Sequence, residues 1–272
     1  MNRVRYYRDE LQEDFAATSG KIDRDCVDGS YRYDRRSPLW QVGVFLLYRL
    51  FATPVVWLYT RIWLGIRVVN RRAMKGIGGC FLYLNHTQDI ADAFIPTIAA
   101  FPKHAHVITG PEAVSIRGIR TLVAMLGAVP LPSRFSAARN FENRLQQLID
   151  EGRAVTVFPE AHIWPYCNFV RHFSDKSFSY PYRTEAPIIA AVVVYRQQRL
   201  LPRCHPHITV YLSDPLYPDL SLPEKQAREL LRDQAFDFMS CTAAAHHSYA
   251  YIRYEKLEPE QLEPEQLEPE RE

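Results

Sequence analysis

The stretch that decides the fold is Cys80-Phe81-Leu82-Tyr83-Leu84-Asn85-His86, in which an apolar run leads directly into an amide and an imidazole. A second stretch repeats the pattern, because Ala154-Val155-Thr156-Val157 leads into Phe158-Pro159-Glu160. A short apolar run that ends abruptly in polar residues is typical of a buried strand that delivers reactive side chains to one edge of a sheet. The two runs therefore predict two strands of one sheet, with a single site at its edge.

The chain beyond these runs alternates strand-like and helix-like segments. Further strands are predicted over residues 105–109, 188–195 and 208–212. A helix is predicted over residues 136–151, with an apolar face made of Phe141, Leu145, Leu148 and Ile149. A second helix is predicted to begin at the capping-box pattern Ser221-Leu222-Pro223-Glu224 and to run to Met239. This alternation indicates the α/β class, with a central mixed sheet flanked by helices.

The most apolar stretch, residues 39–66, precedes the first of these strands. Arg49, Pro54 and Arg61 interrupt it at intervals shorter than the roughly 20 apolar residues of a spanning helix. Three of the four Trp lie in this stretch and arginines flank it, a pattern typical of the headgroup boundary of a membrane. We predict an interfacial membrane-associated segment of two helices, hinged near Pro54. The alternative is a pair of helices that covers the core.

Composition favours one catalytic domain with appendages. The chain has 272 residues and 47% hydrophobic content, enough for one sizeable core. Its end repeats Leu-Glu-Pro-Glu-Gln and is rich in Glu, so we expect disorder there. Without this tail the chain has 31 basic and 23 acidic residues, a net charge of +8 that suits a phosphate-bearing substrate or an acidic lipid surface. The predicted divisions are a charged extension 1–37, interface helices 38–69, a catalytic domain 70–254 and the tail 255–272.

The five cysteines indicate a reducing compartment. They are odd in number and include no CxxC pair, which argues for reduced thiols in the cytosol and against a disulfide framework or a structural zinc site. Residues 1–14 lack the apolar core of a secretory signal. The histidines are scattered, so we expect no metal site. We also expect no cofactor besides the acyl-donor substrate and no nucleic-acid partner.

His86 is the candidate catalytic base. A His just past a strand end can accept a proton, and a nearby carboxylate can fix its tautomer; Asp89 and Asp92 are the two candidates. The chain has no G-x-S-x-G elbow and therefore offers no obvious protein nucleophile. The proton that His86 removes would then belong to a substrate hydroxyl, which would attack an activated acyl group directly.

At these positions the chain resembles the glycerolipid acyltransferases, which include the 1-acyl-glycerol-3-phosphate acyltransferases and their bacterial relatives. Asn85-His86 matches the first block of that family, and Phe158-Pro159-Glu160 matches the third. Residues 127–134, which end in Arg134, look like the second block, and residues 186–192 look like the fourth.

Two departures from the family pattern matter. The acidic residue of the first block should lie five positions after the His, where this chain has Ala91. We favour Asp92, with one extra loop residue, and keep Asp89 as the alternative. Ala161 stands where the third block has Gly, and His162 follows it.

The resemblance implies roles for the site residues. His86 would deprotonate the acceptor hydroxyl, and Asp92 would orient His86. Arg134 would bind the phosphate of the acceptor, with Arg171 as a candidate second arginine, since the planar guanidinium can make paired hydrogen bonds to phosphate. The other substrate-binding candidates are Asn85, Phe158, Pro159 and Glu160.

The expected function is transfer of a fatty acyl group from acyl-CoA or acyl carrier protein to a lysophospholipid, most simply 1-acylglycerol 3-phosphate. The resemblance and residues 39–66 together place the protein on the cytoplasmic face of the cell membrane, as a peripheral or monotopic enzyme of phospholipid biosynthesis. The second candidate is an acyltransferase that uses glycerol 3-phosphate or a lysolipid without phosphate. The further alternatives are a thioester or lysolipid hydrolase and a catalytically inactive, membrane-binding relative.

Overall fold

The computed structural model describes residues 3–15, 27–33, 37–88, 91–115, 120–198 and 205–257. Its strands are β1 (Arg3–Tyr7), β2 (Arg67–Val69), β3 (Cys80–Leu84), β4 (Ala105–Thr109), β5 (Ala128–Pro130), β6 (Ala154–Val157), β7 (Ile188–Arg196), β8 (His207–Leu212) and β9 (Ile252–Lys256). Its α-helices are α1 (Pro38–Phe45), α2 (Thr53–Leu58), α3 (Ile95–Ala99), α4 (Arg120–Met125), α5 (Ala138–Asp150), α6 (Ser179–Arg183) and α7 (Glu224–Ala245). These elements form the predicted α/β fold.

The central sheet has seven strands in the order β2-β8-β7-β3-β6-β4-β5. β3, β4, β5, β6 and β7 run parallel to one another, whereas β8 is antiparallel to β7 and carries β2 beside it. The sheet is therefore mixed, as predicted. Because β3 and β6 are adjacent and parallel, the polar residues that follow them meet at one edge.

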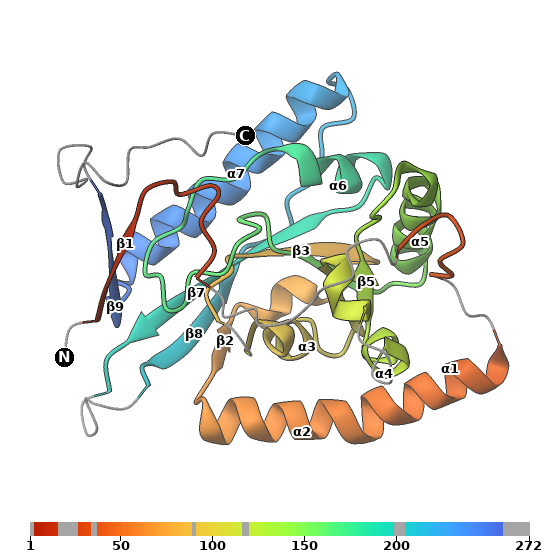
Figure 1. Cartoon of the computed structure of the whole chain (residues 1–272), viewed down its shortest axis with the longest axis horizontal. Helices are drawn as coiled ribbons and strands as arrows, with labels where there is room; N and C mark the ends of the chain where they lie inside the picture. The colour runs from red at the N-terminus through yellow and green to blue at the C-terminus, as the bar shows by residue number, and fades with distance from the viewer. Residues whose placement is uncertain are drawn as a thin grey trace, which may run out of the picture.

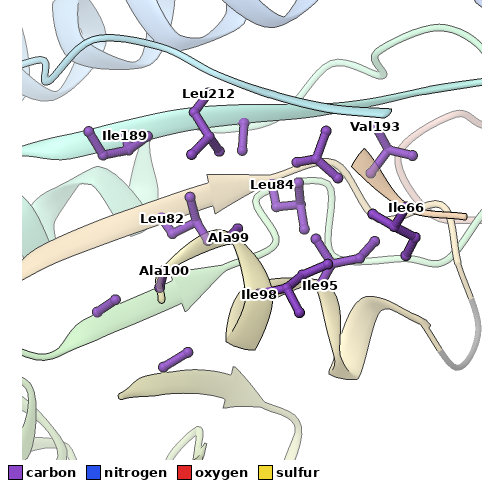
Figure 2. Packing of buried hydrophobic residues seen from close by; sticks show 14 of the residues in the cluster. Ile66, Leu82, Leu84, Ile95, Ile98, Ala99, Ala100, Ile189, Val193 and Leu212 are labelled. Carbon is purple, nitrogen blue, oxygen red and sulfur yellow. The ribbon is translucent and has the colours of Figure 1, made fainter. Parts of the chain in front are cut away.

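Helices cover both faces of this sheet (Figure 1). The face that carries Leu82 and Leu84 packs against Ile95, Ile98 and other residues of α3 (Figure 2). The opposite face packs against α5 and α7, and Phe141, Leu145, Leu148 and Ile149 are the buried face of α5 as predicted. The largely apolar β3 and β7 are buried, except for Arg196 at the end of β7, because both faces of the sheet are covered.

The membrane-interface segment differs from the prediction of two hinged helices. α1 and α2 form one continuous helix from Pro38 to Trp63, joined and extended by π-helical segments at Leu46–Ala52 and Tyr59–Trp63. A proline inside an α-helix clashes with the preceding turn, but the wider π-helical turn before Pro54 makes room for its ring. Thr53 donates both its backbone N–H and its hydroxyl, the latter at 2.7 Å, to the Tyr48 carbonyl in this turn.

Four strands were not predicted, and the predicted start of one helix was wrong. β1, β2, β5 and β9 are short strands without a clear periodic signal. α7 begins at Glu224, three residues after the predicted cap, because the Ser221 hydroxyl donates to Asp219 Oδ1 at 2.6 Å instead of capping the helix.

The predicted division of the chain also needs adjustment. β1, in the charged extension, pairs in parallel with β9, which crosses the expected start of the tail at residue 255. β2 belongs to the central sheet although it precedes residue 70. The rest of the repeat tail, residues 258–272, lies outside the described residues.

Candidate active site

The register of β3 and β6 brings the two polar signals together. Tyr83 of β3 pairs with Val157 of β6, so His86 and Glu160 each lie three residues beyond a paired position. The backbone N–H of His86 donates to Glu160 Oε2 at 3.1 Å, which ties the two strand ends to each other. The two stretches that are far apart in the sequence therefore form one site, as expected.

His86 lies against Asp92. His86 Nδ1 is 2.8 Å from Asp92 Oδ2, and the imidazole stacks on Phe158 with ring centroids 4.2 Å apart. The side chain of Asp92 is 2% exposed and that of His86 is 17% exposed, so Nε2 is the nitrogen left for a substrate. The structure thus places the favoured carboxylate, Asp92, in contact with the candidate base. The alternative, Asp89, lies outside the described residues.

The position of Asp92 depends on a tight turn after His86. Asp92 lies in a 3₁₀ turn, Ala91–Ala93, and its Oδ2 also accepts the Gln88 backbone N–H at 2.8 Å. Burial raises the pKa of Asp92, and the hydrogen bond and charge of His86 oppose this rise. The carboxylate is therefore a buried acceptor whose ionised form depends on its contact with His86.

A second set of buried polar groups holds the loop that carries His86. Gln88 Nε2 donates to the Tyr195 hydroxyl at 2.8 Å, and this hydroxyl lies 2.8 Å from Thr87 Oγ1. All three side chains are buried. Sequence reasoning missed them, because Tyr195 reads only as the end of an apolar strand.

Asn85 has a structural contact instead of the substrate contact expected for it. Its side chain is buried, and its Oδ1 accepts the Val193 backbone N–H at 2.8 Å. Asn85 therefore fixes the end of β3 against β7 and leaves His86 at the surface of the sheet edge. Phe158 and Pro159, which are half-buried, remain beside the imidazole ring and the strand end.

Glu160 and Arg171 also differ from the expectation that they contact substrate. They form a buried ion pair, with 2.9 Å between Arg171 Nη2 and Glu160 Oε2 and side-chain exposures of 1% and 0%. The Arg171 backbone N–H donates to Glu160 Oε1 at 3.0 Å, and its guanidinium lies 4.8 Å from the centroid of the Trp164 ring. Because Glu160 also accepts the backbone N–H of His86, the ion pair holds the loop that carries the candidate base in place.

The backbone conformation at Ala161 shows why the third block of the family has glycine at this position. Ala161 has a φ of +62°, in the left-handed region that glycine adopts without strain. Arg171 Nη2 also donates to the carbonyl of His162, the next residue. The substitution of alanine for glycine is therefore accommodated in a turn that the buried arginine supports.

Arg134 follows β5 at the same carboxyl edge of the sheet as His86. β6 and β4 lie between β3 and β5, so the two strand ends are about 14 Å apart at roughly 4.8 Å per strand. The Arg134 side chain is exposed. The structure therefore places this candidate phosphate ligand beyond β5, at the edge of the sheet that carries the catalytic candidates.

Metal-ligating and thiol side chains are the remaining candidates for a reactive site. Within the described ranges, no group of three or more His, Cys, Asp or Glu side chains is arranged to hold a metal ion. Cys80 and Cys167 are buried free thiols and Cys241 is an exposed one, whereas Cys26 and Cys204 lie outside the described residues. Burial raises the pKa of the Cys80 thiol to about 11, which disfavours it as a nucleophile.

Comparison with known proteins gives two matches. Residues 65–194 match the model of a protein family described as Acyltransferase. The crystal structure of the 1-acyl-sn-glycerophosphate acyltransferase PlsC from Thermotoga maritima is similar at 16% sequence identity and a TM-score of 0.48, over 74% of this chain and 87% of that one. No curated protein sequence matches the chain.

The family match includes the structural features of the site. Residues 65–194 contain β3, β6 and the His86–Asp92 pair, together with the four stretches that resemble the blocks of the family. The match confirms the family resemblance drawn from those blocks. Residues 65–194, which are 130 of the 272 residues of the chain, therefore match the acyltransferase family.

Proposed function

We propose that this chain transfers a fatty acyl group from an acyl thioester, on coenzyme A or acyl carrier protein, to the free hydroxyl of a lysophospholipid, most simply 1-acylglycerol 3-phosphate. The observation that carries the proposal is the 2.8 Å contact between His86 Nδ1 and Asp92 Oδ2 at the sheet edge of an acyltransferase domain. The pair provides a base and its orienting carboxylate, and a substrate hydroxyl supplies the nucleophile.

The proposed reaction needs one proton acceptor. His86 Nε2 accepts the proton of the acceptor hydroxyl while that oxygen bonds to the thioester carbonyl carbon. The carbon–sulfur bond then breaks, the acyl ester stays on the acceptor, and the imidazolium returns the proton to the thiolate that leaves. Asp92 accepts the Nδ1–H and stabilises the imidazolium during this cycle.

Asp92→Asn is expected to lower kcat/KM by about 10²- to 10⁴-fold, because an amide neither fixes the tautomer of His86 nor stabilises its positive charge. The thermal stability of Asp92→Asn should not fall together with its activity. Burial raises the folded-state pKa of Asp92, so ionising it disfavours folding above that pKa, and the neutral Asn should keep or raise the Tm at pH 7. Below the unfolded pKa of Asp, about 3.9, this difference should disappear.

The measurement is steady-state kinetics beside thermal unfolding at pH 7 and pH 3. Asp237→Asn, at an exposed position of α7, is the matched control and should change neither quantity. Wild-type kcat/KM in Asp92→Asn would contradict the role of Asp92.

The identity of the acceptor rests on charge. The exposed Arg134 lies on the catalytic edge of the sheet, and the chain without its acidic tail has a net charge of +8. Both suit an acceptor that carries a phosphate. Glycerol 3-phosphate carries the same group and is the second candidate, and a lysolipid without phosphate is the third.

We also propose that the helix Pro38–Trp63 attaches the enzyme to the membrane, on its cytoplasmic face. By length and composition this is the one helix of the described residues that could cross a membrane. Tyr48, Val56 and Thr60 are buried against the domain, and the Tyr48 hydroxyl bonds to Thr97 at 3.2 Å. Because the helix packs along the domain, we favour a monotopic helix that lies in the interface.

The surface of this helix supports the same orientation. Large apolar side chains on it are more than 40% exposed, and they include Leu39, Phe45, Leu50, Phe51, Val55, Trp57, Ile62 and Trp63. The arginines that interrupt the apolar stretch bond to the protein instead, since Arg49 donates to the Pro102 carbonyl and Arg61 to the Ile66 carbonyl. An exposed apolar surface of this extent is typical of a membrane contact.

The double substitution Leu50→Glu and Trp57→Glu is expected to release the protein from lipid vesicles. Each side chain contributes roughly 1.5–3 kcal/mol when fully buried, so partitioning should fall by at least about 10²-fold. The two side chains are 60% and 53% exposed, so folding stability should hardly change.

Vesicle sedimentation measures this partitioning. The matched control is Leu220→Glu with Leu230→Glu, at two exposed leucines. Leu230 lies on α7, which is on the opposite side of the sheet from this helix (Figure 1). Equal sedimentation of both double variants would contradict attachment through this helix.

The test of the proposed function is an acyl-transfer assay in vesicles with a panel of substrates. Labelled acyl-CoA and acyl carrier protein are the donors, and the acceptors are 1-acylglycerol 3-phosphate, glycerol 3-phosphate and lysolipids without a phosphate monoester. The proposal predicts the highest kcat/KM for 1-acylglycerol 3-phosphate. No product with any acceptor and either donor would contradict it and favour an inactive, membrane-binding relative.

A further inference from the structure

The contact between His86 and Asp92 depends on the loop that leaves β3. Asp92 follows His86 by six residues, and its Oδ2 lies 2.8 Å from His86 Nδ1. The same oxygen accepts the backbone N–H of Gln88, also at 2.8 Å. Gln88 therefore fixes the carboxylate oxygen that holds the imidazole, and a shift of the Gln88 backbone would move Asp92 relative to the ring.

The side chain of Gln88 is tied to β7. Its Nε2 donates to the hydroxyl of Tyr195 at 2.8 Å. This hydroxyl also lies 2.8 Å from Thr87 Oγ1 and 3.1 Å from the Thr87 carbonyl oxygen. A phenol hydroxyl donates one hydrogen bond and can accept two, so it can bond to all three groups at once. Tyr195 thus holds the two residues that follow His86.

Tyr195 reaches this loop because β7 continues past the end of β3. The last pair between the two strands is Leu84 with Ala191, whereas β7 runs on to Arg196. Successive side chains of a strand alternate between its faces, so Tyr195 shares a face with Ala191. The backbone of Tyr195 is paired with Ile208 of β8. The hydroxyl is therefore carried by a rigid element of the sheet.

Burial makes these hydrogen bonds hard to replace. Thr87 and Tyr195 are fully buried, and Gln88 is 6% exposed. Burial also raises the pKa of Tyr195, so its hydroxyl keeps the proton that it donates. Without this hydroxyl the amide of Gln88 would be a buried donor that has lost its acceptor, a state that favours movement of the side chain.

We propose that Tyr195 is a positioning residue for the acyl transfer, and that its hydroxyl sets, through Gln88, the orientation of Asp92 toward His86. The inference rests on the proposed function, in which His86 is the base. Tyr195 acts on the loop from the sheet, whereas the buried ion pair described above acts on it from the loop after β6.

Other bonds keep the loop folded when the hydroxyl is removed. The His86 carbonyl accepts the backbone N–H of Trp164 at 3.1 Å. The Thr87 carbonyl accepts the backbone N–H of Tyr166 at 2.9 Å. These are bonds between backbone groups, so a substitution of the Tyr195 side chain leaves them in place. The loss is then confined to the orientation of Gln88.

The first test is the kinetics of Tyr195→Phe and Gln88→Met. Phenylalanine removes only the hydroxyl, and methionine removes the amide but keeps the side-chain length and the backbone N–H of residue 88. In each variant kcat should fall by about 10- to 10²-fold, because a displaced carboxylate no longer aligns the base. KM should hardly change. The double variant should lose no more than the larger single loss, because both substitutions break the same connection.

Tyr83→Phe is the matched control. The Tyr83 hydroxyl donates to the Ser177 carbonyl at 2.8 Å, and the side chain is as fully buried as that of Tyr195. Tyr83 lies on the adjacent strand β3 but packs on the opposite face of the sheet. Both variants lose a buried hydroxyl, so the Tm should fall in both, whereas kcat should fall only in Tyr195→Phe. Equal kcat in the two variants would overturn the proposal.

A spectroscopic readout that needs no turnover separates this proposal from the proposed function. The NMR signal of the Nδ1 proton of His86, assigned by its absence in His86→Ala, should lie far downfield because Asp92 accepts this proton. It should move upfield in Tyr195→Phe and Gln88→Met, and stay in place in Tyr83→Phe. An unchanged signal in all three variants would overturn the positioning role even if kcat falls. The expected shifts in a protein without acyl transfer would support the positioning role and refute the proposed function.

Discussion

Replacing His86 with alanine is expected to lower kcat/KM for acyl transfer by about 10²- to 10⁴-fold, the usual contribution of a general base. The reason is specific to Nε2. Nδ1 is held by Asp92 at 2.8 Å, so Nε2 is the nitrogen of this ring that can accept a proton from a substrate. The effect should appear mainly in kcat, because the methyl group of alanine leaves room for the acceptor.

The matched control for this substitution is His246→Ala. The ring of His246 stacks on Tyr211 with centroids 4.1 Å apart, much as His86 stacks on Phe158 at 4.2 Å, but it lies at the end of α7. Both substitutions therefore remove a stacked imidazole. Activity of His86→Ala equal to that of His246→Ala would exclude His86 as the base.

Replacing Arg171 with leucine is expected to lower the free energy of unfolding by about 3–5 kcal/mol. The substitution leaves Glu160 as a buried carboxylate without its guanidinium partner, which lies 2.9 Å away in the native protein. At about 2–4 °C per kcal/mol the Tm should fall by roughly 6–20 °C. The double variant Glu160→Leu with Arg171→Leu should lose less than the sum of the single losses, because no charge then remains buried.

The pH dependence of this loss has a definite sign. Burial raises the pKa of Glu160, and the charge of Arg171 opposes that rise, so removing Arg171 raises this pKa further. A raised folded-state pKa gives stability that is present at low pH and is lost as the pH rises through it. The deficit of Arg171→Leu relative to the wild-type protein should therefore shrink as the pH falls.

Urea unfolding of the two single variants and the double variant measures these losses in the free energy of unfolding. Arg183→Leu is the control, because Arg183 contacts Glu142 and Glu224 with a side chain that is 51% exposed, and such pairs contribute at most about 1 kcal/mol. If Arg171→Leu unfolds within 1 kcal/mol of the wild-type protein, the buried pair does not hold the site together.

The sequence predicted those features of the fold and of the site that depend on a local pattern of residues. Strand β3 and the polar residues after it are visible as an apolar run that stops at Asn85-His86, and β4 has the predicted bounds. The strand pairing then determines that His86 and Glu160 meet, because both follow adjacent parallel strands. Asp92 could be favoured over Asp89 only from the apolar residues that follow it, and the 3₁₀ turn at Ala91–Ala93 is what presents it to His86.

What the sequence did not reveal depends on contacts between distant residues. From the sequence, Arg171 is a candidate phosphate ligand. In the structure it is buried, because its loop folds back on Glu160 and Trp164. Asn85 reads as a site residue, but its amide bonds to the β7 backbone. Pro54 reads as a hinge, and only the π-helical turn before it explains the continuous helix. No periodic pattern encodes these contacts.

Acyl transfer to an acceptor hydroxyl is the proposed activity of this chain, as opposed to hydrolysis of a thioester. The most direct measurement is the fate of a labelled acyl group when the wild-type protein, a labelled acyl thioester and vesicles are mixed with increasing 1-acylglycerol 3-phosphate. We expect labelled two-chain phospholipid that forms only with added acceptor and disappears in His86→Ala. Labelled free fatty acid, released at the same rate with and without acceptor, would contradict it and identify a hydrolase.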